Sequence, residues 1–298
     1  MRLLSFHTGD GTPRVGALTE LGIADLTTLL PPHTGLSPMR TLIATTDRTR
    51  LADAITTAPL LDPTAVTLLP PVPDPSKIIA APVNYVDHQQ EMSQSVHIGS
   101  LGVFLKAPSS LTAHGGTVRL PYHDRRFDQE GELAVVIGST ASHVPEERAL
   151  EHVFGYTCLL DMTMRGGEDR STRKSFDTFT PCGPHIVTPD EAGPVEELEL
   201  RCWVNKQLRQ QTHLADLIWN VPKLIAYTSS VMRLEPGDLI ATGTPAGVGQ
   251  VLDGDTISVE ITRIGQLEIT VTTHGALPSP TLGADRGPTP PATLTPIS

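Results

Sequence analysis

Apolar residues in the middle of the chain form short runs that are rich in β-branched side chains or alternate with polar residues. Runs of about four to eight residues bounded by turn residues are typical of strands. Gly237-Asp238 and Asp253-Gly254-Asp255 mark two such turns. The pattern therefore predicts a mainly β core with some α, an α+β fold. The clearest strands are expected at 133–137, 153–160, 198–204 and 256–262.

Helical periodicity is sparse. The best candidate helix runs from Leu214 to Met232, where apolar residues recur at helical spacing. Pro222 cannot donate a backbone hydrogen bond, so it must lie in the first turn of this helix or kink it. A second helical pattern lies near residues 39–55.

The chain divides into four regions by composition. Residues 1–68 alternate short apolar runs with turns and predict a small N-terminal α/β domain, and the proline-rich segment 69–76 reads as a stiff linker. A catalytic domain is expected over 77–275. Residues 276–298 are rich in proline and poor in large apolar side chains, which predicts a disordered tail.

Composition excludes several classes of function. The chain has 298 residues and a formal charge of −11, which argues against a nucleic-acid surface. It lacks a run of about 20 apolar residues, so no membrane span and a cytoplasmic location are expected. Its three cysteines have no C-x-x-C spacing, which indicates buried thiols rather than disulfides or a zinc site.

Three acidic residues suggest a metal site. Glu130 and Glu132 lie two residues apart, so a strand places both on one face, and Asp161 follows a neighbouring apolar strand. Three carboxylates suit Mg²⁺ or Mn²⁺, with one divalent ion per site. Taken alone, two glutamates at this spacing are more often a solvated strand face.

The residues around these acids occur in an order and spacing that resemble the fumarylacetoacetate hydrolase family, from Lys77 to Val271. The resemblance implies a mixed β-roll core and a homodimer. The matching segments are Lys77–Ala80, Asn84–His88 with Glu91, Phe104–Lys106 with Pro108–Ser110, Asp128–Leu133, Gly155–Arg165, Lys174–Asp177 with Pro181–Pro184, and Thr242–Pro245 with Gly247 and Gly249.

His88 and Glu91 are the predicted catalytic pair. Residues i and i+3 of a helix share a face, so Glu91 can hold one imidazole nitrogen while the other takes a proton from water. The resemblance supports this role, because a His/Glu dyad occupies the matching positions in the family. Without the resemblance, His88 would more often be structural.

The resemblance also implies four further site residues. Lys174 is expected in the active site as a cationic partner that balances the acids, although an exposed lysine is the alternative. Arg165 is expected to grip a substrate carboxylate, and Thr244 to offer donors to the acid group of the substrate. Tyr85 either lines the pocket or packs in the core.

Three positions depart from the family pattern. Family members usually have Asn before the third metal ligand, Asp after the arginine and Gln three residues beyond it, whereas this chain has Leu160, Gly166 and Glu168. Leu160 removes a hydrogen bond near the ligand. Glu168 is expected to add a fourth acid near the site. We therefore expect metal chemistry in an altered pocket.

These features favour a metal-dependent enzyme acting on a small 1,3-dicarbonyl or 2-keto acid. The first hypothesis is C–C hydrolysis or decarboxylation of an acylpyruvate-like substrate. The alternatives are an isomerase or tautomerase of a hydroxy-dienoate and a tailoring enzyme that cyclises a polyketide-like dicarbonyl. A non-catalytic descendant that binds a metabolite is a remote third possibility, since fold alone does not fix function.

Overall fold

Two long antiparallel strands, β11 (Gly131–Ile137) and β12 (Val153–Leu160), form the centre of the molecule, which a computed structural model describes over residues 1–32 and 34–292. Leu133 pairs with Cys158, and every residue of both strands is buried. Strands covered on both faces carry continuous apolar runs, so the sequence pattern predicted both. Strands dominate the fold, and the predicted α+β class is confirmed.

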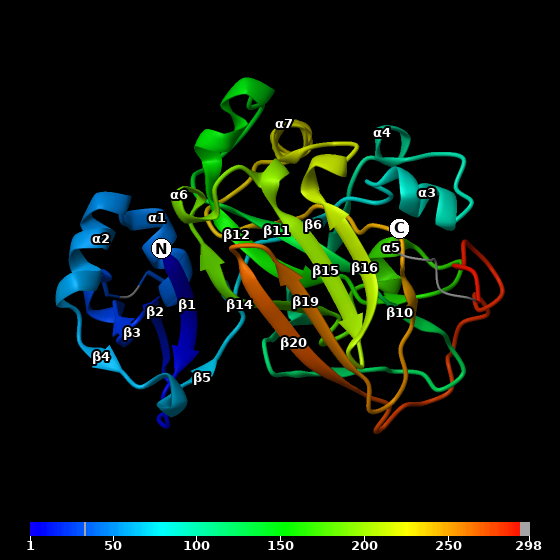
Figure 1. Ribbon diagram of the computed structural model, residues 1–298, viewed down its shortest axis with the longest axis horizontal. Helices are drawn as coiled ribbons and strands as arrows, with labels where there is room; N and C mark the ends of the chain where they lie inside the picture. The colour runs from blue at the N-terminus through cyan, green and yellow to red at the C-terminus, as the bar shows by residue number, and fades with distance from the viewer. Residues whose placement is uncertain (33, 293–298) are drawn as a thin grey trace.

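Further strands extend this pair into a large mixed sheet (Figure 1). Within the described residues the sheet has twelve strands, in the order β4-β3-β2-β1-β14-β12-β11-β17-β6-β7, with β5 beside β1 and β8 beside β14. The other strands in its central part are β6 (Ile78–Ala80), β7 (Phe104–Lys106), β8 (Leu111–Ala113), β14 (Thr180–Val187) and β17 (Leu239–Ala241).

The N-terminal region, blue in Figure 1, shares this sheet with the rest of the chain, because β1 pairs with β14 through Arg2 and Val187. The division into separate domains at residue 68 stays a prediction. The elements of this region are β1 (Arg2–His7), β2 (Pro13–Thr19), β3 (Gly22–Asp25), α1 (Pro38–Thr45), α2 (Arg48–Thr57), β4 (Leu60–Leu61) and β5 (Thr67–Leu68).

The helical pattern near residues 39–55 forms two helices rather than one. Thr46 ends α1 in an extended conformation. Asp47 then begins α2, since its side chain accepts a hydrogen bond from the backbone N–H of Arg50. An aspartate in this position satisfies a donor that the first turn would leave free, which explains the break.

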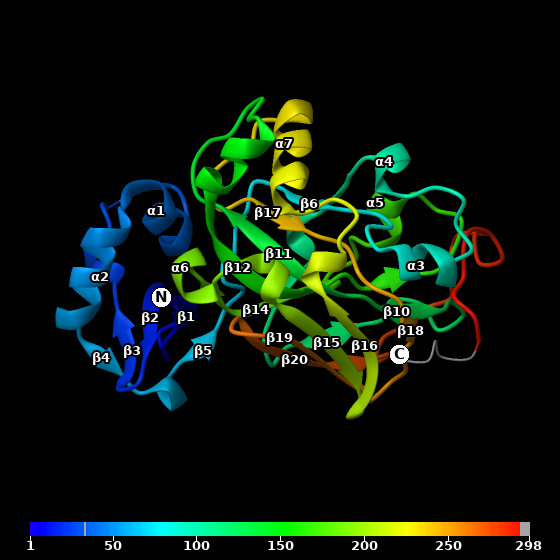
Figure 2. The same cartoon turned by 45° about the horizontal axis from the view of Figure 1, so that its top comes forward.

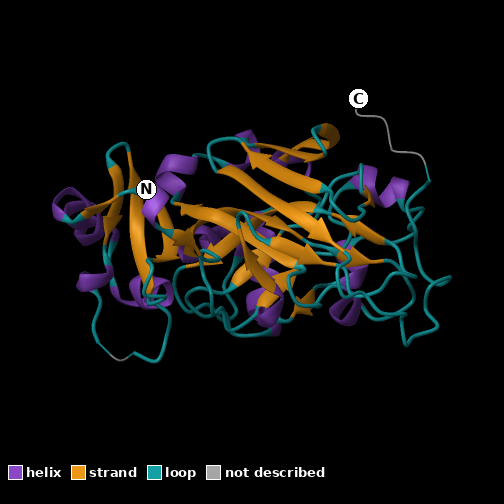
Figure 3. Ribbon diagram, turned by 90° about the horizontal axis from the view of Figure 1, so that it is seen from below, coloured by secondary structure: helices purple, strands orange, loops and turns teal. Residues whose placement is uncertain are grey.

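A second, five-stranded sheet packs against the β11–β12 pair (Figures 2 and 3). Its strand order is β16-β15-β19-β20-β9 within the described residues. A Cβ placed on Gly131 would lie 3.2 Å from Cys202 and 3.3 Å from Val259, so the two layers meet tightly at the start of β11. The strands are β9 (Thr117–Arg119), β15 (Glu199–Val204), β16 (Gln207–His213), β19 (Thr256–Ile261) and β20 (Gly265–Thr272).

A small sheet and the helices α3 (Val86–Glu91), α4 (Ile98–Leu101) and α5 (Arg170–Arg173) lie at one end of these layers, whereas α6 (Pro189–Ala192) lies beside β12 and β14 (Figures 1 and 2). Across residues 1–32 and 34–292, no helix has both the length and the apolar composition to cross a membrane. The strands of the small sheet are β10 (Phe127–Gln129), β13 (Thr163–Met164) and β18 (Gly249–Gln250), and a further helix is α7 (Val221–Val231).

The longest helix, α7, begins later than the sequence pattern suggested. Residues Leu214–Asp216 form a separate 3-10 turn, and Asn220 caps α7 by accepting from the backbone N–H of Lys223. Pro222 lies in the first turn, where its missing N–H costs nothing. The first of the two predicted positions for Pro222 is therefore correct.

The C-terminal segment forms no named helix or strand over residues 276–292, and the disorder expected for it stays a prediction. These residues run back along the core beside α3, as the red trace in Figures 1 and 2 shows. The backbone N–H of Leu277 donates to Pro121, and the backbone N–H of Gly167 donates to Gly283. The expected disorder of residues 293–298 lies outside the described residues.

An ion pair anchors this segment. Both terminal nitrogens of Arg125 donate to the Glu168 carboxylate at 2.8 Å. The Thr281 hydroxyl, at 2.8 Å from Arg125, also donates to Glu168. The hydrogen bonds from Arg125 lower the pKa of Glu168 to about 2, so the carboxylate is fully charged at neutral pH. Polar contacts thus hold a segment that has few apolar side chains to bury.

We predict that Glu168→Gln loosens the C-terminal segment. The amide of Gln cannot form the ion pair that the Glu168 carboxylate forms with Arg125. The population of molecules in which the C-terminal segment is detached from the core should therefore rise roughly tenfold. Trypsin cleavage after Arg286, followed by mass spectrometry under native conditions, should accelerate by that factor. The melting temperature of the core should stay within about 2 °C. Equal cleavage rates in both proteins would show that this pair does not hold the segment.

Candidate metal and substrate site

Three buried carboxylates converge at one end of the β11–β12 pair. Glu130, Glu132 and Asp161 each place one oxygen within 4.8 Å of the others. The sheet register explains this arrangement. Gly131 pairs with Leu160 at the end of the two strands, and in the next pair the backbone N–H of Asp161 donates to the backbone carbonyl of Glu130 at 2.8 Å. The two glutamates alternate around Gly131 and therefore share a face. The structure brings together all three predicted metal ligands.

Lysine side chains neutralise two of these acids. Lys174 Nζ donates to Glu130 at 2.6 Å and to Asp161 at 2.5 Å, which places the predicted cationic partner inside the site. Lys106 Nζ donates to the other oxygen of Asp161 at 2.5 Å and to the carbonyl of Phe179 at 2.9 Å. The sequence analysis gave Lys106 no role. Its place at the end of a short apolar strand could have indicated a buried lysine.

Arg165 lies in the site, but its guanidinium is engaged by protein carboxylates. Its Nε donates to Asp128 at 2.6 Å and its Nη2 to Glu130 at 2.9 Å. Asp128 also accepts from Arg126 at 2.8 Å. Sequence reasoning assigned no role to Asp128, although it continues the same alternation toward Glu130 and Glu132. Arg165 therefore orients Glu130, one of the three candidate metal ligands.

The two glutamates differ in electrostatic environment. Burial opposes ionisation of both, but Lys174 and then Arg165 hold the pKa of Glu130 well below its ordinary value. Burial and then the charge of Asp161 raise the pKa of Glu132 well above its ordinary value. Within the described residues Glu132 has no lysine or arginine ion pair, and it accepts from the backbone N–H of Gly243 at 2.7 Å.

These residues fit a divalent ion. All three candidate ligands offer oxygen, the donor that Mg²⁺ and Mn²⁺ prefer. Glu132 is a buried acid that lacks a cation of its own, and a divalent ion would supply the missing positive charge. Glu130 and Asp161 are already oriented by lysine and arginine, which is the arrangement of supporting hydrogen bonds that metal sites use.

His88, the histidine of the predicted His/Glu pair, faces the cavity that two of these acids line. His88 Nδ1 lies 3.2 Å from a Glu91 oxygen, and His88 lines the cavity together with Glu130 and Glu132. The other Glu91 oxygen accepts from the backbone N–H of Gly247 at 2.9 Å. The helix α3 is thus attached to the turn that follows β17, and Glu91 is held in position to orient the imidazole.

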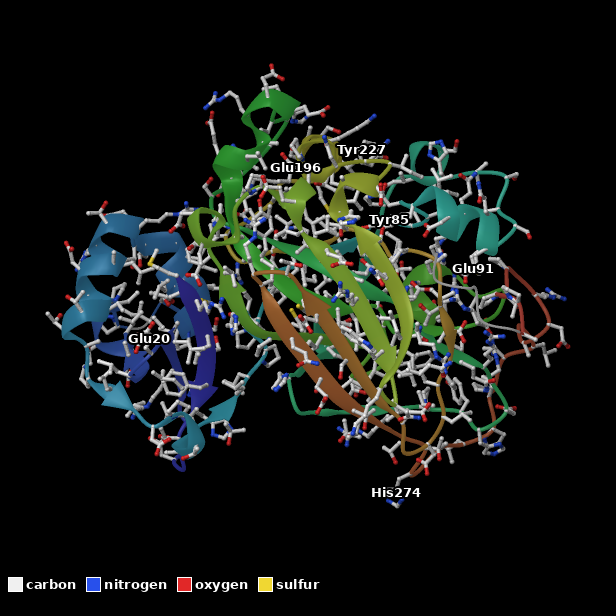
Figure 4. The ribbon with its side chains drawn as sticks, in the orientation of Figure 1. Glu20, Tyr85, Glu91, Glu196, Tyr227 and His274 are labelled. Atoms are coloured by element: carbon white, nitrogen blue, oxygen red, sulfur yellow. The ribbon has the colours of Figure 1, made fainter. Side chains whose placement is uncertain are left out.

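The two remaining predicted substrate contacts differ. Thr244 lines the cavity, but its hydroxyl donates to the Gly131 carbonyl at 3.0 Å and accepts from Gln210 at 2.7 Å. Tyr85 is buried at the start of α3, at the opposite end from Glu91 (Figure 4), and lies outside the cavity lining. Its hydroxyl has no hydrogen-bond partner in the described structure. A substrate-binding role for Tyr85 stays a prediction.

Two of the three departures from the family pattern serve the C-terminal segment. A Cβ on Gly166 would lie 2.1 Å from Arg125 Nη2, and the φ of +157° there favours glycine. Glu168 is not part of the cavity lining, because its carboxylate is turned toward Arg125. The expected fourth acid in the pocket is therefore absent from the cavity as described. Leu160 is fully buried in β12.

The rest of the cavity wall combines apolar and cationic side chains. Met92 and Phe104 line it on the apolar side, and Pro288 from the C-terminal segment also contributes. Its volume is about 30 Å³, whereas sites for small molecules usually hold several hundred. A keto acid therefore requires one wall to move. The cationic side is formed by Arg165, Lys174 and two arginines of α5, Arg170 and Arg173.

Comparison with known proteins agrees with this geometry. The family model of the fumarylacetoacetate (FAA) hydrolase C-terminal region matches residues 77–272. The chain is 45% identical over 247 residues to the maleylpyruvate hydrolase of Aquipseudomonas alcaligenes, covering 79% of this chain and 82% of that protein. It is 41% identical over 218 residues to the oxaloacetate tautomerase YisK of Bacillus subtilis, covering 68% and 72%.

A solved structure shows the same fold. The crystal structure of maleylpyruvate hydrolase from Sphingobium sp. SYK-6 in complex with manganese(II) and pyruvate matches with a TM-score of 0.79 and 39% sequence identity. The match covers 91% of this chain and 99% of that one. The sequence motifs, the fold and the family match agree, and the chain belongs to the fumarylacetoacetate hydrolase family.

Proposed function

We propose that this protein is a divalent-metal-dependent enzyme that hydrolyses the C–C bond of an acylpyruvate. The observation that supports the proposal is that His88, which contacts Glu91, lines one cavity with Glu130 and Glu132, two of the three converging buried acids. Two maleylpyruvate hydrolases among its relatives support the choice of substrate, and one of them was crystallised with manganese(II) and pyruvate.

A divalent ion held by Glu130, Glu132 and Asp161 would polarise the 2-keto acid end of the substrate and stabilise enolate charge. His88 takes a proton from water, and the resulting hydroxide adds to the distal carbonyl carbon. The C–C bond on the pyruvate side then breaks, and a proton returns to the carbanion carbon. The products are pyruvate and the carboxylic acid of the acyl arm.

Glu91 orients the His88 ring so that His88 can act as the base. Because Glu91 engages Nδ1, the other ring nitrogen is free to face the cavity. Glu91 is itself held by the backbone N–H of Gly247. Lys174, which contacts two of the acids and lies 5.4 Å from the centre of the Phe104 ring, keeps Glu130 and Asp161 in their orientation.

A second candidate function is keto–enol tautomerisation, which the 41% identity to an oxaloacetate tautomerase favours. That reaction moves one proton between oxygen and carbon and consumes no water. Decarboxylation of a β-keto acid uses the same charge stabilisation and releases CO₂. A cytoplasmic location, expected from the absence of a long apolar run, and a homodimer, implied by the family resemblance, stay predictions.

Product analysis tests these alternatives directly. Acetylpyruvate and oxaloacetate are incubated with Mg²⁺, with Mn²⁺ and with chelator, while pyruvate, CO₂ and the enol absorbance are followed. Chelator-sensitive pyruvate release from acetylpyruvate supports hydrolysis, and CO₂ release supports decarboxylation. Loss of enol absorbance without fragments would replace hydrolysis by tautomerisation.

We predict that Glu132→Gln separates metal binding from folding. The amide keeps the size and the hydrogen bond from Gly243 but removes an acid that is costly to bury. Mn²⁺ affinity measured by calorimetry should fall by roughly 100-fold. The melting temperature of the metal-free protein should stay the same or rise. Unchanged Mn²⁺ binding would exclude Glu132 as a ligand.

We predict that His88→Asn lowers kcat for acylpyruvate hydrolysis by about 10²- to 10⁴-fold, because the general base is lost. Mn²⁺ affinity should stay within about threefold of wild type, since His88 is not one of the three converging acids. Glu91→Gln, which disturbs only the orientation of the ring, should cost less. Full hydrolysis by His88→Asn would reject the dyad as the source of the base.

A further inference from the structure

The short helix α5 places two arginines on the cavity wall (α5 is labelled in Figure 2). Arg173 is only 6% exposed. Among the described residues, no carboxylate forms an ion pair with Arg173 or Arg170, and neither side chain donates a hydrogen bond. Buried cations are normally paired. An unpaired guanidinium that lines a ligand cavity therefore indicates a missing anion.

The other cations of the site are already committed. Lys174 and Lys106 contact Asp161, and Arg165 and Arg126 contact Asp128. Together with the two glutamates, these acids balance those four cations, and a divalent ion would add two further positive charges. The carboxylate at the 2-keto acid end of a substrate offsets one of these charges, and the enolate charge that develops during the reaction offsets the other. The charges on α5 then remain without a counterion.

We propose that Arg173, with Arg170 beside it, binds a second carboxylate at the far end of the acyl arm. The substrate class is then a dicarboxylic acylpyruvate rather than a simple one. This inference rests on the proposed function and deepens it. The planar guanidinium matches a carboxylate through two parallel hydrogen bonds. Arg165 is unavailable for this role, because Asp128 and Glu130 occupy it.

The surrounding structure fixes α5 at both ends. Asp169 caps the helix by accepting from the backbone N–H of Ser171 at 2.8 Å. Past its C-terminus, the Ser175 hydroxyl accepts from the backbone N–H of Ala107 at 2.9 Å. Lys174 directly follows Arg173 and points to the metal-site acids. This segment thus directs Lys174 to the metal-site acids and Arg173 to the cavity wall.

The first test compares two substrates in the metal-loaded full-length enzyme. Arg173→Gln is assayed with acetylpyruvate, which has one carboxylate, and with maleylpyruvate, whose acyl arm ends in a second. We expect kcat/KM for maleylpyruvate to fall roughly 10- to 100-fold, mainly through KM, while the value for acetylpyruvate changes less than about threefold. An equal fall for both substrates, or no fall for either, would overturn the inference.

Two variants serve as controls. Arg170→Gln, at the less buried of the two positions, should show the same substrate preference with a smaller effect. Arg50→Gln, on the exposed side of α2, removes the same charge far from the site and should leave both substrates unchanged. Arg173→Gln should melt no lower than wild type, because it removes a buried charge that lacks a partner.

A binding measurement separates failure of this inference from failure of the proposed function. The Mn²⁺-loaded protein is titrated by calorimetry with pyruvate and with maleate, which represent the two halves of the substrate. Maleate binding should weaken at least tenfold in Arg173→Gln, and pyruvate binding should not. Suppose that wild type cleaves neither substrate while maleate binding alone weakens in Arg173→Gln. That result would support the carboxylate site and reject the proposed hydrolysis. If maleate binds both proteins equally, the carboxylate site is rejected.

Discussion

The site depends on holding three buried carboxylates within a few ångströms of one another. Unpaired, such a cluster would be strongly destabilising, because burial and mutual repulsion both oppose ionisation. Two lysines and an arginine contribute the compensating charge, with Lys174 bridging Glu130 and Asp161 and Lys106 contacting Asp161 from below. Only Glu132 is left without a cation partner in the described structure. The protein thereby fixes the geometry of two ligands and leaves the third to be neutralised by the ion.

Packing between the two sheets holds the charged side chains of the site in place. Gln210 on β16 accepts from the backbone N–H of Gly131 at 2.9 Å and donates to Thr244 at 2.7 Å and to the Pro245 carbonyl at 2.9 Å. One buried amide thus ties the acid-bearing strand to the turn after β17. The base lies on α3, a helix of six residues that is attached to the same turn through Glu91. Two of the candidate metal ligands therefore flank the start of β11, and the candidate base lies on a short helix that Glu91 attaches to the same core.

The sequence predicted what local periodicity and local spacing determine. The central strands, the pairing of Glu130 with Glu132 on one face, and the His88–Glu91 contact all follow from repeats of two or three residues. Lys106 and the Arg125–Glu168 pair depend on contacts between residues far apart in the chain, which no local pattern encodes. The contacts of the C-terminal segment could not be predicted from the sequence for the same reason. Its composition indicates little apolar burial, but its position is set by polar partners elsewhere.

The unusual residues at 166 and 168 and the free arginines of α5 have a common explanation. In the family pattern the positions just after the active-site arginine carry side chains able to meet the substrate. Here Gly166 makes room for Arg125, and Glu168 binds that arginine and Thr281, so this stretch holds the C-terminal segment instead. Neither Gly166 nor Glu168 lines the cavity. Arg173, five residues further along, is buried, cationic and unpaired among the described residues, and it lines the cavity on the same side. The candidate metal ligands Glu130 and Glu132 and these arginines therefore lie on one cavity, apart from the stretch that holds the C-terminal segment.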